Sequence, residues 1–465
     1  MKRCIIPILL LLIITSGKLL AQEQRPNIVF IITDDQRADW LGTAGHPDLK
    51  TPNIDRLAHE GVRFTHFFVT TPLCSPSRAS FLTGQYAHKH LVTNNDRLGI
   101  EVIGHTLMTF PRRLREEGYE TAFIGKWHMG LDDSRRPGFD QWISFKGQGQ
   151  YLDPVVNENG TRRQLDGYMT DYLNQKAVEF VMQPRSRPFV LYVSHKAVHY
   201  PYIPAPRHDS LYSDVAFSLP VILEDDYKGK PALHLNLPNV PWYDLEGIVP
   251  EPGQPRRGRG RDPASIVRDQ MRSLMSVDEG VGMLLDALTR MGQLDNTLII
   301  FTSDNGYLLG EHGRFNDKRL AYDESIGVPF IIRYPALATP GTTIDALTLN
   351  VDVAPTLLDV AGVEPVTPMQ GRSLLPLLRD PSGPWRSSML TEYFLEKVAP
   401  NARPWLSVRT DRWKYIRYTD LEGMDELYDL HADPYELSNL IADPSVLSTL
   451  AEMKTKLDSL LTATK

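Results

Sequence analysis

Four small groups of charged and imidazole side chains stand out because each follows an apolar, β-branched run. The groups are Asp34 with Asp35, Lys126 with His128, His195 with His199, and Asp304 with Asn305. In open α/β sheets, ligands bind beyond the carboxyl ends of the strands. Because four separate runs deliver such side chains, the sequence predicts a charged site at that edge of a sheet.

Two of these groups offer only hard oxygen donors. Three carboxylates, from Asp34, Asp35 and Asp304, and the amide of Asn305 suit Ca²⁺ or Mg²⁺. Zinc, in contrast, prefers nitrogen and sulfur ligands. Carboxylates at strand ends can also cap loops, and the first aspartate pair alone would favour that interpretation. With the second pair on another strand, the set predicts a cation site.

Cys74 is one of two cysteines, and its neighbours predict the start of a helix. Ser75 can cap this helix, Pro76 fits its first position, and Gly84 can end it. Cys74 would then lie at a helix N-terminus, where partial positive charge favours an anion. Arg78 follows one turn later.

Three chemistries are open to Cys74. A lone cysteine can be a small buried hydrophobe, and a thiolate at a helix start can be a nucleophile. A soft thiolate, however, is a poor match for a cluster that binds a hard cation. If Cys74 reaches the carboxylates, an oxygen-bearing derivative of its side chain fits the site better.

The runs before these groups indicate buried strands of a parallel-type sheet. We expect strands at residues 27–33, 121–125, 189–193, 297–302 and 330–334, and helices at residues 54–60 and 264–291. Strands that alternate with helices predict an α/β sandwich. Residues 204–262 are rich in proline and poor in periodicity, so long surface excursions are expected there.

Beyond about residue 381 the pattern changes to a small α+β domain. We expect strands at residues 388–392, 405–409 and 413–418, and an amphipathic helix at residues 445–461. The basic stretch at residues 255–261 is expected to be a solvated loop, with contact to an anionic polymer as the alternative.

The N-terminus resembles a secretory leader. Lys2 and Arg3 precede an apolar stretch at residues 5–14, and residues 19–21 suit cleavage. A membrane anchor is the alternative, but the stretch is too short to span a bilayer comfortably. We therefore expect a signal peptide at residues 1–21, a secreted or periplasmic protein, and no stable membrane insertion.

Length and charge limit the possible partners. The 465 residues suit one large domain and a smaller one, and 42% apolar content permits a sizeable core. The formal net charge is −7, and the predicted leader carries three cations and no acid, so the remainder is more acidic still. An acidic chain is a poor general binder of nucleic acid.

The segment C-x-P-S-R followed by A-S-F-L-T-G, at residues 74–84, resembles the signature of type I (formylglycine-dependent) sulfatases. In that family the motif directs oxidation of its cysteine to formylglycine. Further landmarks appear in family order: PNIVFIITDDQ, TPNIDRLAHEGVRF, GKWHMG, TSDNGYLLGEHG, NDKRLAYDESIGVP, GRSLLPLL and DLHADPYELSNL. The resemblance covers nearly the whole chain after the leader.

The resemblance implies an alkaline-phosphatase-like α/β sandwich at residues 22–380 and a smaller C-terminal α+β domain at residues 381–465. It also implies a bound calcium ion. The chain would hydrolyse sulfate esters after a formylglycine-generating enzyme or an anaerobic sulfatase maturase has oxidised Cys74 to formylglycine (3-oxoalanine).

The resemblance also implies residue roles. Calcium ligands would be Asp34, Asp35, Asp304, Asn305 and one oxygen of the hydrated formylglycine at residue 74. Arg78 would stabilise this hydrate, Lys126 and Lys318 would bind sulfate oxygens, His128 would help to release sulfate, and His199 would protonate the departing alcohol. Val198 replaces the proline commonly found before that histidine, so His195 remains an alternative acid.

A sulfated glycan is the expected substrate, with 6-sulfated N-acetylglucosamine favoured. Residues 87–95 and 302–307 are similar to segments of N-acetylglucosamine-6-sulfatases. Candidates for hydroxyl recognition are His88, His90, Asn94, Asn95, Asp96 and Arg97, although His88 and His90 could instead cap a helix. Glu311, His312 and Glu324 are candidates to contact the metal ligands and hold them in place without binding the metal themselves.

Two other functions are compatible with the sequence. A phosphodiesterase or phosphonate monoester hydrolase of the same fold can share the metal site and the formylglycine. A non-catalytic glycan-binding protein would result if Cys74 were never converted. A comparison of sulfate and phosphate esters as substrates separates the first alternative from a sulfatase. Mass analysis of the Cys74 peptide tests the second, because it shows whether Cys74 has been converted.

Overall fold

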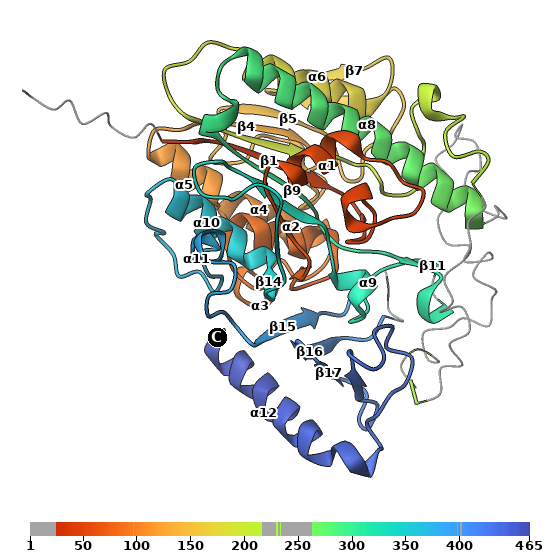
Figure 1. Cartoon of the computed structure of the whole chain (residues 1–465). Helices are drawn as coiled ribbons and strands as arrows, with labels where there is room; N and C mark the ends of the chain where they lie inside the picture. The colour runs from red at the N-terminus through yellow and green to blue at the C-terminus, as the bar shows by residue number, and fades with distance from the viewer. Residues whose placement is uncertain are drawn as a thin grey trace, which may run out of the picture.

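The computed structural model describes residues 25–95, 97–215, 229–230, 233, 263–313, 315–397, 399 and 402–465. These residues form a large α/β domain and a smaller C-terminal domain that lies below it in Figure 1. The predicted signal peptide and the basic stretch at residues 255–261 lie outside the described residues. No helix in the described ranges has the length and apolar content needed to cross a membrane.

The large domain is built on a ten-stranded sheet with the order β13-β2-β12-β9-β1-β8-β4-β5-β6-β7. Five central strands run parallel: β9 (Thr297–Ser303), β1 (Asn27–Thr33), β8 (Phe189–Ser194), β4 (Glu120–Gly125) and β5 (Gln141–Ser144). All residues of β1, β8 and β9 are buried. Burial on both faces explains their continuous apolar runs, and the four strands predicted here are confirmed.

The fifth predicted strand is β12 (Phe330–Arg333), and it runs antiparallel to β9. The expectation of a purely parallel set is therefore wrong at this position. Antiparallel neighbours need no crossover helix, and the helical elements in the described chain between β9 and β12 are only the short α9 (Asp323–Ile326) and a single 3₁₀ turn, Glu311–Gly313. The outer strands are β2 (Val62–Phe64), β13 (Thr342–Ile344), β6 (Val155–Glu158) and β7 (Thr161–Gln164).

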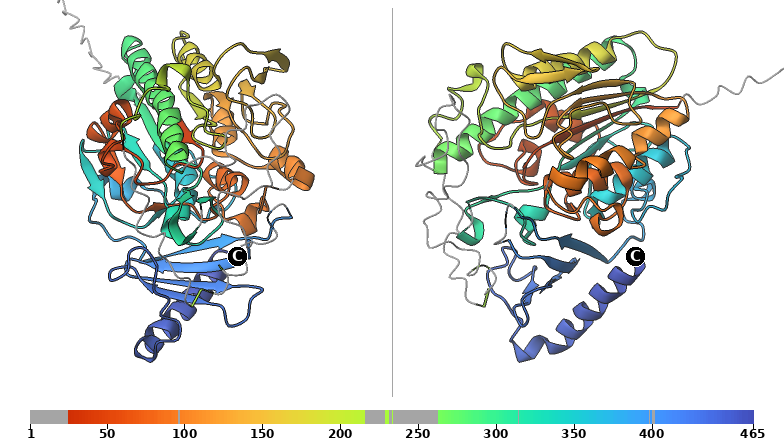
Figure 2. Two further views of the ribbon diagram at one scale, coloured as in Figure 1. Left: turned by 90° about the vertical axis from the view of Figure 1, so that its right-hand side faces the viewer. Right: turned by 180° about the vertical axis from the view of Figure 1, so that it is seen from behind.

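Helices cover both faces of this sheet (Figures 1 and 2). One face carries α1 (Pro52–His59), α6 (Met169–Val181) and α8 (Pro263–Arg290), whose apolar residues join one core cluster. The other carries α2 (Cys74–Thr83), α5 (Phe110–Glu116), α10 (Val353–Val360) and α11 (Leu375–Arg379), which join a second cluster. The predicted α/β sandwich is confirmed, and the two predicted helices correspond to α1 and α8.

Shorter elements connect these layers. They are α3 (Ala87–His90), α4 (Arg97–Thr106), β3 (Phe67–Phe68), β10 (Leu308–Leu309), β11 (Phe315–Asp317) and β14 (Thr348–Leu349), with 3₁₀ turns that include Gly42–Ala44 and Pro206–His208. The predicted excursion at residues 204–262 is described only in part, and its first described portion contains the turn at Pro206–His208.

The C-terminal domain is an antiparallel sheet with one long helix across it. The sheet has the order β15 (Ser388–Tyr393), β16 (Trp405–Thr410), β17 (Trp413–Tyr418) and β18 (Glu426–Asp429), and the helix is α12 (Leu447–Ala463). The three predicted strands and the helix are confirmed, whereas the sequence did not predict β18. All four β18 residues are buried although two are acidic.

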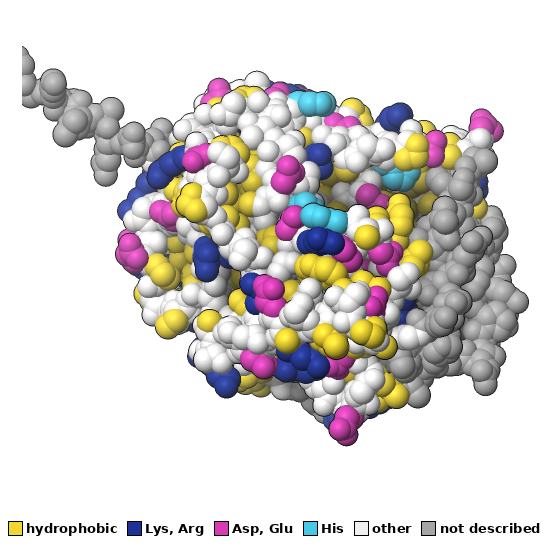
Figure 3. Space-filling view, turned by 60° about the horizontal axis from the view of Figure 1, so that its bottom comes forward, with side chains coloured by type: hydrophobic (Ala, Val, Ile, Leu, Met, Phe, Trp, Pro, Cys, Tyr) yellow, Lys and Arg dark blue, Asp and Glu magenta, His cyan; other side chains and the backbone are white. Residues whose placement is uncertain are grey.

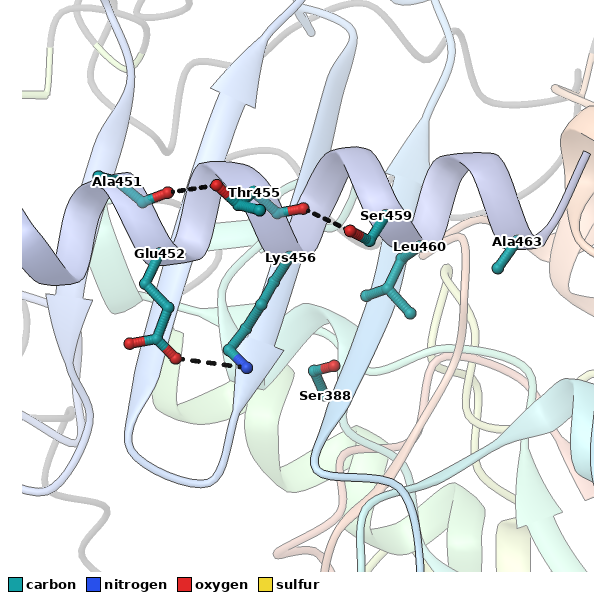
Figure 4. Close-up of a pocket in the computed structure, with 8 residues that line it drawn as sticks. All are labelled: Ser388, Ala451, Glu452, Thr455, Lys456, Ser459, Leu460 and Ala463. Atoms are coloured by element: carbon teal, nitrogen blue, oxygen red, sulfur yellow. Dashed lines mark hydrogen bonds and ion pairs between the residues drawn. The ribbon is translucent and has the colours of Figure 1, made fainter.

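A surface groove of about 580 Å³ lies between α12 and Ser388 of β15 (Figure 4). Thr455 and Ser459 donate their hydroxyls to carbonyl groups one turn earlier, each at 2.9 Å. Glu452 and Lys456 form an ion pair at 3.3 Å. The charged groups that line the groove are therefore paired with each other, and none of the candidate site residues lies there.

Candidate active site

The carboxyl ends of β1, β4, β8 and β9 meet at one edge of the sheet. Asp34 and Asp35 directly follow β1, and Asp304 directly follows β9, which pairs with β1 along its whole length. One oxygen from each of these three carboxylates lies within 4.8 Å of the others, and all three side chains are buried. The structure therefore brings together the three aspartates that the sequence singled out.

Asn305 completes this cluster of oxygen donors. Its amide nitrogen donates to Asp35 Oδ1 at 2.7 Å and to the Gly306 carbonyl at 2.8 Å. Its Oδ1 atom is buried and has no hydrogen-bond partner among the residues that the structure describes. A buried carbonyl oxygen without a partner costs free energy, and here it lies beside three carboxylates. This donor set fits a hard divalent cation such as Ca²⁺.

Two lysines approach the carboxylates. Lys126, directly after β4, forms a buried ion pair with Asp34, and Lys318 forms one with Asp35. Burial raises the pKa of Asp34, but Lys126, His199 and Arg78 outweigh this and hold the pKa well below its usual range. Burial and the neighbouring Asp34 raise the pKa of Asp304 to about 6. The site thus concentrates charges of both signs in a small buried volume.

Helix α2 begins at Cys74 itself, and its first backbone bond runs from Ser77 N to the Leu73 carbonyl at 3.0 Å. The expectation that Ser75 caps the helix and that Pro76 is its first residue is wrong. Ser75 is already helical, and its hydroxyl donates to the carbonyl of His128 instead. Gly84 ends the helix in the left-handed region (φ 68°), as predicted.

Cys74 is 0% exposed and faces both the carboxylates and a lysine. Its Sγ lies 3.8 Å from Asp34 Oδ1 and 2.9 Å from Lys318 Nζ. Burial raises the pKa of this thiol to about 11, although Lys126 and Lys318 act against the shift. At neutral pH the unmodified side chain is therefore a protonated thiol, which is a weak nucleophile.

Arg78 ties the start of α2 to three strand ends. Its Nε donates to Asp304 Oδ2 at 2.8 Å, and its NH1 donates to the Lys126 carbonyl at 3.0 Å and to the Ser194 hydroxyl. Ser194 is the last residue of β8. Because the guanidinium is buried and held by these hydrogen bonds, it fixes Cys74 relative to Asp304 and Lys126.

The structure brings His199 to the carboxylates and leaves His195 outside them. His199 Nε2 lies 3.7 Å from Asp35 Oδ2, and its Nδ1 donates to the Tyr200 carbonyl at 2.8 Å. His199 also groups with Asp34 and Cys74 within 4.8 Å. Burial lowers the pKa of His195 to about 3, with no charged neighbour among the causes. Its Nδ1 has no hydrogen-bond partner among the described residues.

His128 lies three residues after the end of β4 and beside the start of α2. Its backbone is left-handed (φ 57°), and its carbonyl accepts the Ser75 hydroxyl. The Nδ1 atom is buried without a hydrogen-bond partner in the described part of the chain. Burial, followed by the nearby Lys126, lowers the pKa of the imidazole well below 6.5, so the ring is neutral at pH 7.

Lys196 is a buried charged residue that the sequence analysis missed. Its Nζ donates to the Tyr200 carbonyl at 3.1 Å, the same oxygen that accepts His199 Nδ1. It also lies 5.0 Å from the centre of the Tyr151 ring. Burial and the charge of Lys126 lower its pKa to about 7. In the sequence, the position of Lys196 between His195 and His199 was the signal that could have identified it.

Several candidates for substrate recognition have structural partners. Both ring nitrogens of His88 are bound, to Glu392 at 2.8 Å and to the Thr464 carbonyl at 2.9 Å. His90 bonds to Ser80 and to the backbone of Val92. Asn95 Oδ1 accepts the backbone N–H of Ser75 at 3.0 Å. Asn94 is partly buried, whereas Asp96 and the Arg97 side chain lie outside the described residues.

Glu311, His312 and Glu324 have neighbours outside the carboxylate cluster. Glu311 pairs with Arg37, two residues after Asp35, and accepts the backbone N–H of Leu309 at 2.6 Å. His312 stacks on Tyr322 with ring centres 3.7 Å apart. Burial and the nearby Glu436 raise the pKa of Glu324 to about 8. Glu311 thus supports the segment after β1, and the other two lie towards the C-terminal domain.

Figure 3 views the molecule with the C-terminal domain turned forward. Lysine, arginine, acidic and histidine side chains gather near the middle of this face, and hydrophobic side chains are interspersed among polar ones. The described part of this face therefore offers charged groups rather than a continuous apolar surface.

Comparison with known proteins identifies relatives of this chain. A family model described as "Sulfatase" matches residues 26–363, and one described as "N-sulphoglucosamine sulphohydrolase, C-terminal" matches residues 310–463. An N-acetylglucosamine-6-O-sulfatase of Bacteroides thetaiotaomicron is 35% identical over 473 residues, which cover 90% of this chain and 83% of the relative.

Two solved structures extend this comparison. One, in complex with its substrate D-glucosamine-2-N,6-O-disulfate, has a TM-score of 0.84 and 33% identity, covering 95% of this chain and 98% of the other. The other is a phosphonate monoester hydrolase of Agrobacterium radiobacter, with a TM-score of 0.77 and 25% identity over 95% of this chain and 96% of that one.

Proposed function

Because the chain belongs to the sulfatase family and is an enzyme of that class, we propose that it removes sulfate from a glucosamine-containing glycan, with 6-sulfated N-acetylglucosamine as the favoured substrate. The observation that carries this proposal is the position of residue 74 at the start of a buried helix, between the carboxylate cluster and Lys318. The named substrates of the two most similar relatives described above support the glucosamine assignment.

The proposed metal is Ca²⁺, held by Asp34, Asp35, Asp304, Asn305 and an oxygen of the modified residue 74. The partnerless Oδ1 of Asn305 and the three close carboxylates support this ligand set. A bound divalent cation polarises sulfate oxygens and stabilises the charge that develops on them.

The proposed nucleophile is formylglycine, produced at Cys74 by a formylglycine-generating enzyme or an anaerobic sulfatase maturase. The hydrated aldehyde offers one hydroxyl for attack on sulfur, and its second hydroxyl allows the aldehyde to re-form as sulfate leaves. The raised pKa of the unmodified thiol supports a modified side chain rather than a thiolate. Arg78, with three hydrogen bonds and its ion pair to Asp304, would hold residue 74 in place.

The remaining side chains have proposed roles in binding and proton transfer. Lys126 and Lys318 would bind sulfate oxygens, and Lys318 Nζ already lies 2.9 Å from Cys74 Sγ. His199 would protonate the leaving alcohol through Nε2, because Nδ1 is committed to the Tyr200 carbonyl. His128 would help to release sulfate. Charge stabilisation by groups fixed before the reaction is usually the largest contribution to such catalysis.

We propose an export signal and a domain boundary for this chain. We infer that residues 1–21 direct export to the periplasm or the medium, where polymeric sulfated glycans occur. We also infer a boundary between the catalytic domain and the C-terminal domain near residue 380, because the separate antiparallel sheet begins at Ser388. Export of a fusion that carries residues 1–21 would test the first inference.

The similarity to a phosphonate monoester hydrolase makes hydrolysis of phosphonate monoesters the second candidate reaction. Sulfate monoesters carry one negative charge before attack, as phosphonate monoesters do, so the same cationic site can accept both. Comparison of kcat/KM for a sulfated sugar and a phosphonate monoester therefore decides between the two reactions. We expect the sulfated sugar to be preferred.

The proposal is tested by two measurements on the protein co-expressed with a maturase. Mass analysis of the tryptic Cys74 peptide should show the aldehyde, which hydrazide reagents also label. A panel of defined sulfated mono- and oligosaccharides, assayed for released sulfate, should show turnover of 6-sulfated N-acetylglucosamine. Only free thiol in active protein would refute the nucleophile, and refusal of every sugar sulfate would refute the substrate class.

A further inference from the structure

Hydrogen bonds close a ring of residues beside the nucleophile. Ser75, which follows Cys74, donates its backbone N–H to Asn95 Oδ1 at 3.0 Å. Asn95 in turn donates its backbone N–H to Glu396 Oε1 at 2.9 Å, and Arg319 Nε donates to Glu396 Oε2 at 2.6 Å. Lys318, which precedes Arg319, returns to Cys74 Sγ at 2.9 Å.

Glu396 is the only member of this ring from the C-terminal domain. Its side chain is 0% exposed, and its Oε2 also accepts the Tyr393 hydroxyl at 3.0 Å. Both carboxylate oxygens are therefore committed, to groups from three different segments of the chain. Placing a carboxylate at 0% exposure is costly unless it is paired and hydrogen-bonded, and Glu396 is both.

The backbone conformation of Arg319 is a second, independent observation that surrounding contacts hold this residue in place. Its φ is +83°, in the left-handed region that non-glycine residues rarely adopt. Such a conformation costs about 1 kcal/mol or more and persists only where surrounding contacts maintain it. Here the contacts come from the C-terminal domain: Glu396 holds the side chain, and Trp405 Nε1 donates to the Arg319 carbonyl at 2.8 Å.

Two members of the ring, Asn95 and Arg319, are partly exposed, whereas Cys74 is buried. Asp34 and Asp304, on the inner side, are fully buried. Partly exposed residues near Cys74 include His128, His199, Asn95 and Arg319, and the Arg319 side chain is 21% exposed. Because the catalytic groups are buried, an approach past these side chains would let their spacing limit which leaving groups can enter.

We propose that Glu396 is a positioning residue for the sulfatase reaction: by holding Asn95 and Arg319, it fixes the opening through which the sugar part of the substrate reaches residue 74. This inference rests on the proposed function. It assigns the C-terminal domain a part in substrate selection, although none of the five metal-ligand candidates and none of the proposed catalytic side chains belongs to that domain.

The alternative is that Glu396 only joins the two domains. Glu392 provides a matched control for this alternative, because it is an equally buried acid from the same region. Its carboxylate is 1% exposed and joins His88 to the C-terminal domain, but it takes no part in the ring. Replacing either acid by glutamine keeps the side-chain shape and removes one buried ion pair.

The test compares Glu396→Gln with Glu392→Gln on two substrates, 6-sulfated N-acetylglucosamine and the small aryl ester 4-nitrophenyl sulfate. With Glu396→Gln we expect KM for the sugar to rise about tenfold and kcat to stay within about threefold, the pattern of lost positioning before the chemical step. For the aryl ester, kcat/KM should stay within about twofold of wild type. Glu392→Gln should leave both KM values close to wild type.

Equal losses on both substrates, or the same rise in KM with Glu392→Gln, would show a purely structural role. An unchanged KM for the sugar in Glu396→Gln would also overturn the inference. If this variant does not fold, Arg319→Lys breaks the same bond from the partly exposed side and should raise KM in the same way.

Amide hydrogen exchange separates failure of this inference from failure of the proposed function. In Glu396→Gln, exchange at residues 94–95 and 318–320 should rise relative to both wild type and Glu392→Gln. If wild-type protein releases no sulfate from any ester, the proposed function fails, and the exchange data still decide whether Glu396 holds these segments. Unchanged exchange there would overturn the positioning role.

Discussion

The floor of the active site, which we define as Cys74, Asp34, Asp35, Asp304 and Lys126, can be compared with its rim, formed by Asn95, Arg319 and Glu396. Every floor residue is buried, and four of the five directly follow a strand or begin a helix. The rim residues come from segments between the main elements, and two of them are partly exposed.

This difference separates two tasks. The floor concentrates opposite charges in a buried volume, where each group compensates its neighbours and fixed charges act most strongly on a reaction. The rim contains one ion pair and backbone hydrogen bonds, which set distances rather than charge. We therefore expect changes in the floor to reduce kcat or metal binding, and changes in the rim to act on KM and on stability.

The largest effect is expected at residue 74. Cys74→Ala removes the precursor of the nucleophile and should reduce turnover by about 10⁴-fold or more. The fold should persist, because α2 keeps its backbone bonds and the loss of one sulfur atom leaves only a small void. Sulfate release and a thermal unfolding curve measure the two consequences. Turnover at the wild-type rate would mean that another residue is the nucleophile.

The next effect concerns the interface between the two domains. Lys414 is 0% exposed and pairs with Asp323 at 2.6 Å and with Glu436 at 2.7 Å. Lys414→Met should destabilise the protein by about 3 kcal/mol, because it leaves Glu436 buried without its cation. Lys456→Met, on the exposed pair of α12, should cost less than about 1 kcal/mol. Equal unfolding midpoints in denaturant for the two variants would contradict this expectation.

A smaller effect tests the metal assignment in the floor. Asn305→Ala removes the partnerless Oδ1 and keeps all three carboxylates. We expect Ca²⁺ affinity to fall by about 10- to 100-fold. Calcium titration followed by calorimetry, and the rise of Tm with added Ca²⁺, report this without any activity measurement. If wild type binds no Ca²⁺ and EDTA leaves its Tm unchanged, the cation assignment fails.

Sequence predicted the floor because its signal is local. β1, β4 and β9 are apolar runs, and the polar residues that matter follow them within one or two positions. The start of α2 was placed too late because the Ser75 hydroxyl, a good cap by its chemistry, is used by the carbonyl of His128. That partner lies 53 residues away, where local rules do not reach.

The rim could not be predicted because its partners lie even further apart in the sequence. Asn95 was singled out, but for hydroxyl recognition, and its partner Glu396 lies 301 residues further along the chain. β18 was missed because its charged ends suggest a loop. Its Glu426 is buried because the hydroxyls of Tyr322, Tyr418 and Tyr428 donate to it. The pairings of Asn95 with Glu396 and of Tyr322 with Glu426 exist only after the C-terminal domain has docked.

The smallest predicted effect is a pH dependence of this docking, centred on His88. Its two ring nitrogens face two acceptors, Glu392 Oε2 and the Thr464 carbonyl, so only the imidazolium can donate to both. The hydrogen bond to Glu392 raises the pKa of His88 above 6.5, against the opposing effect of burial.

A raised pKa in the folded state means that the stabilisation is fully present below about pH 6.5 and is lost as pH rises through the folded value. Wild type should therefore exceed His88→Gln in stability by about 1–2 kcal/mol at pH 6, the size of a charge-assisted hydrogen bond, and by less at pH 9. Denaturant unfolding of both proteins at the two pH values measures this difference. A gap that stays constant or widens with pH would show that His88 acts by packing alone.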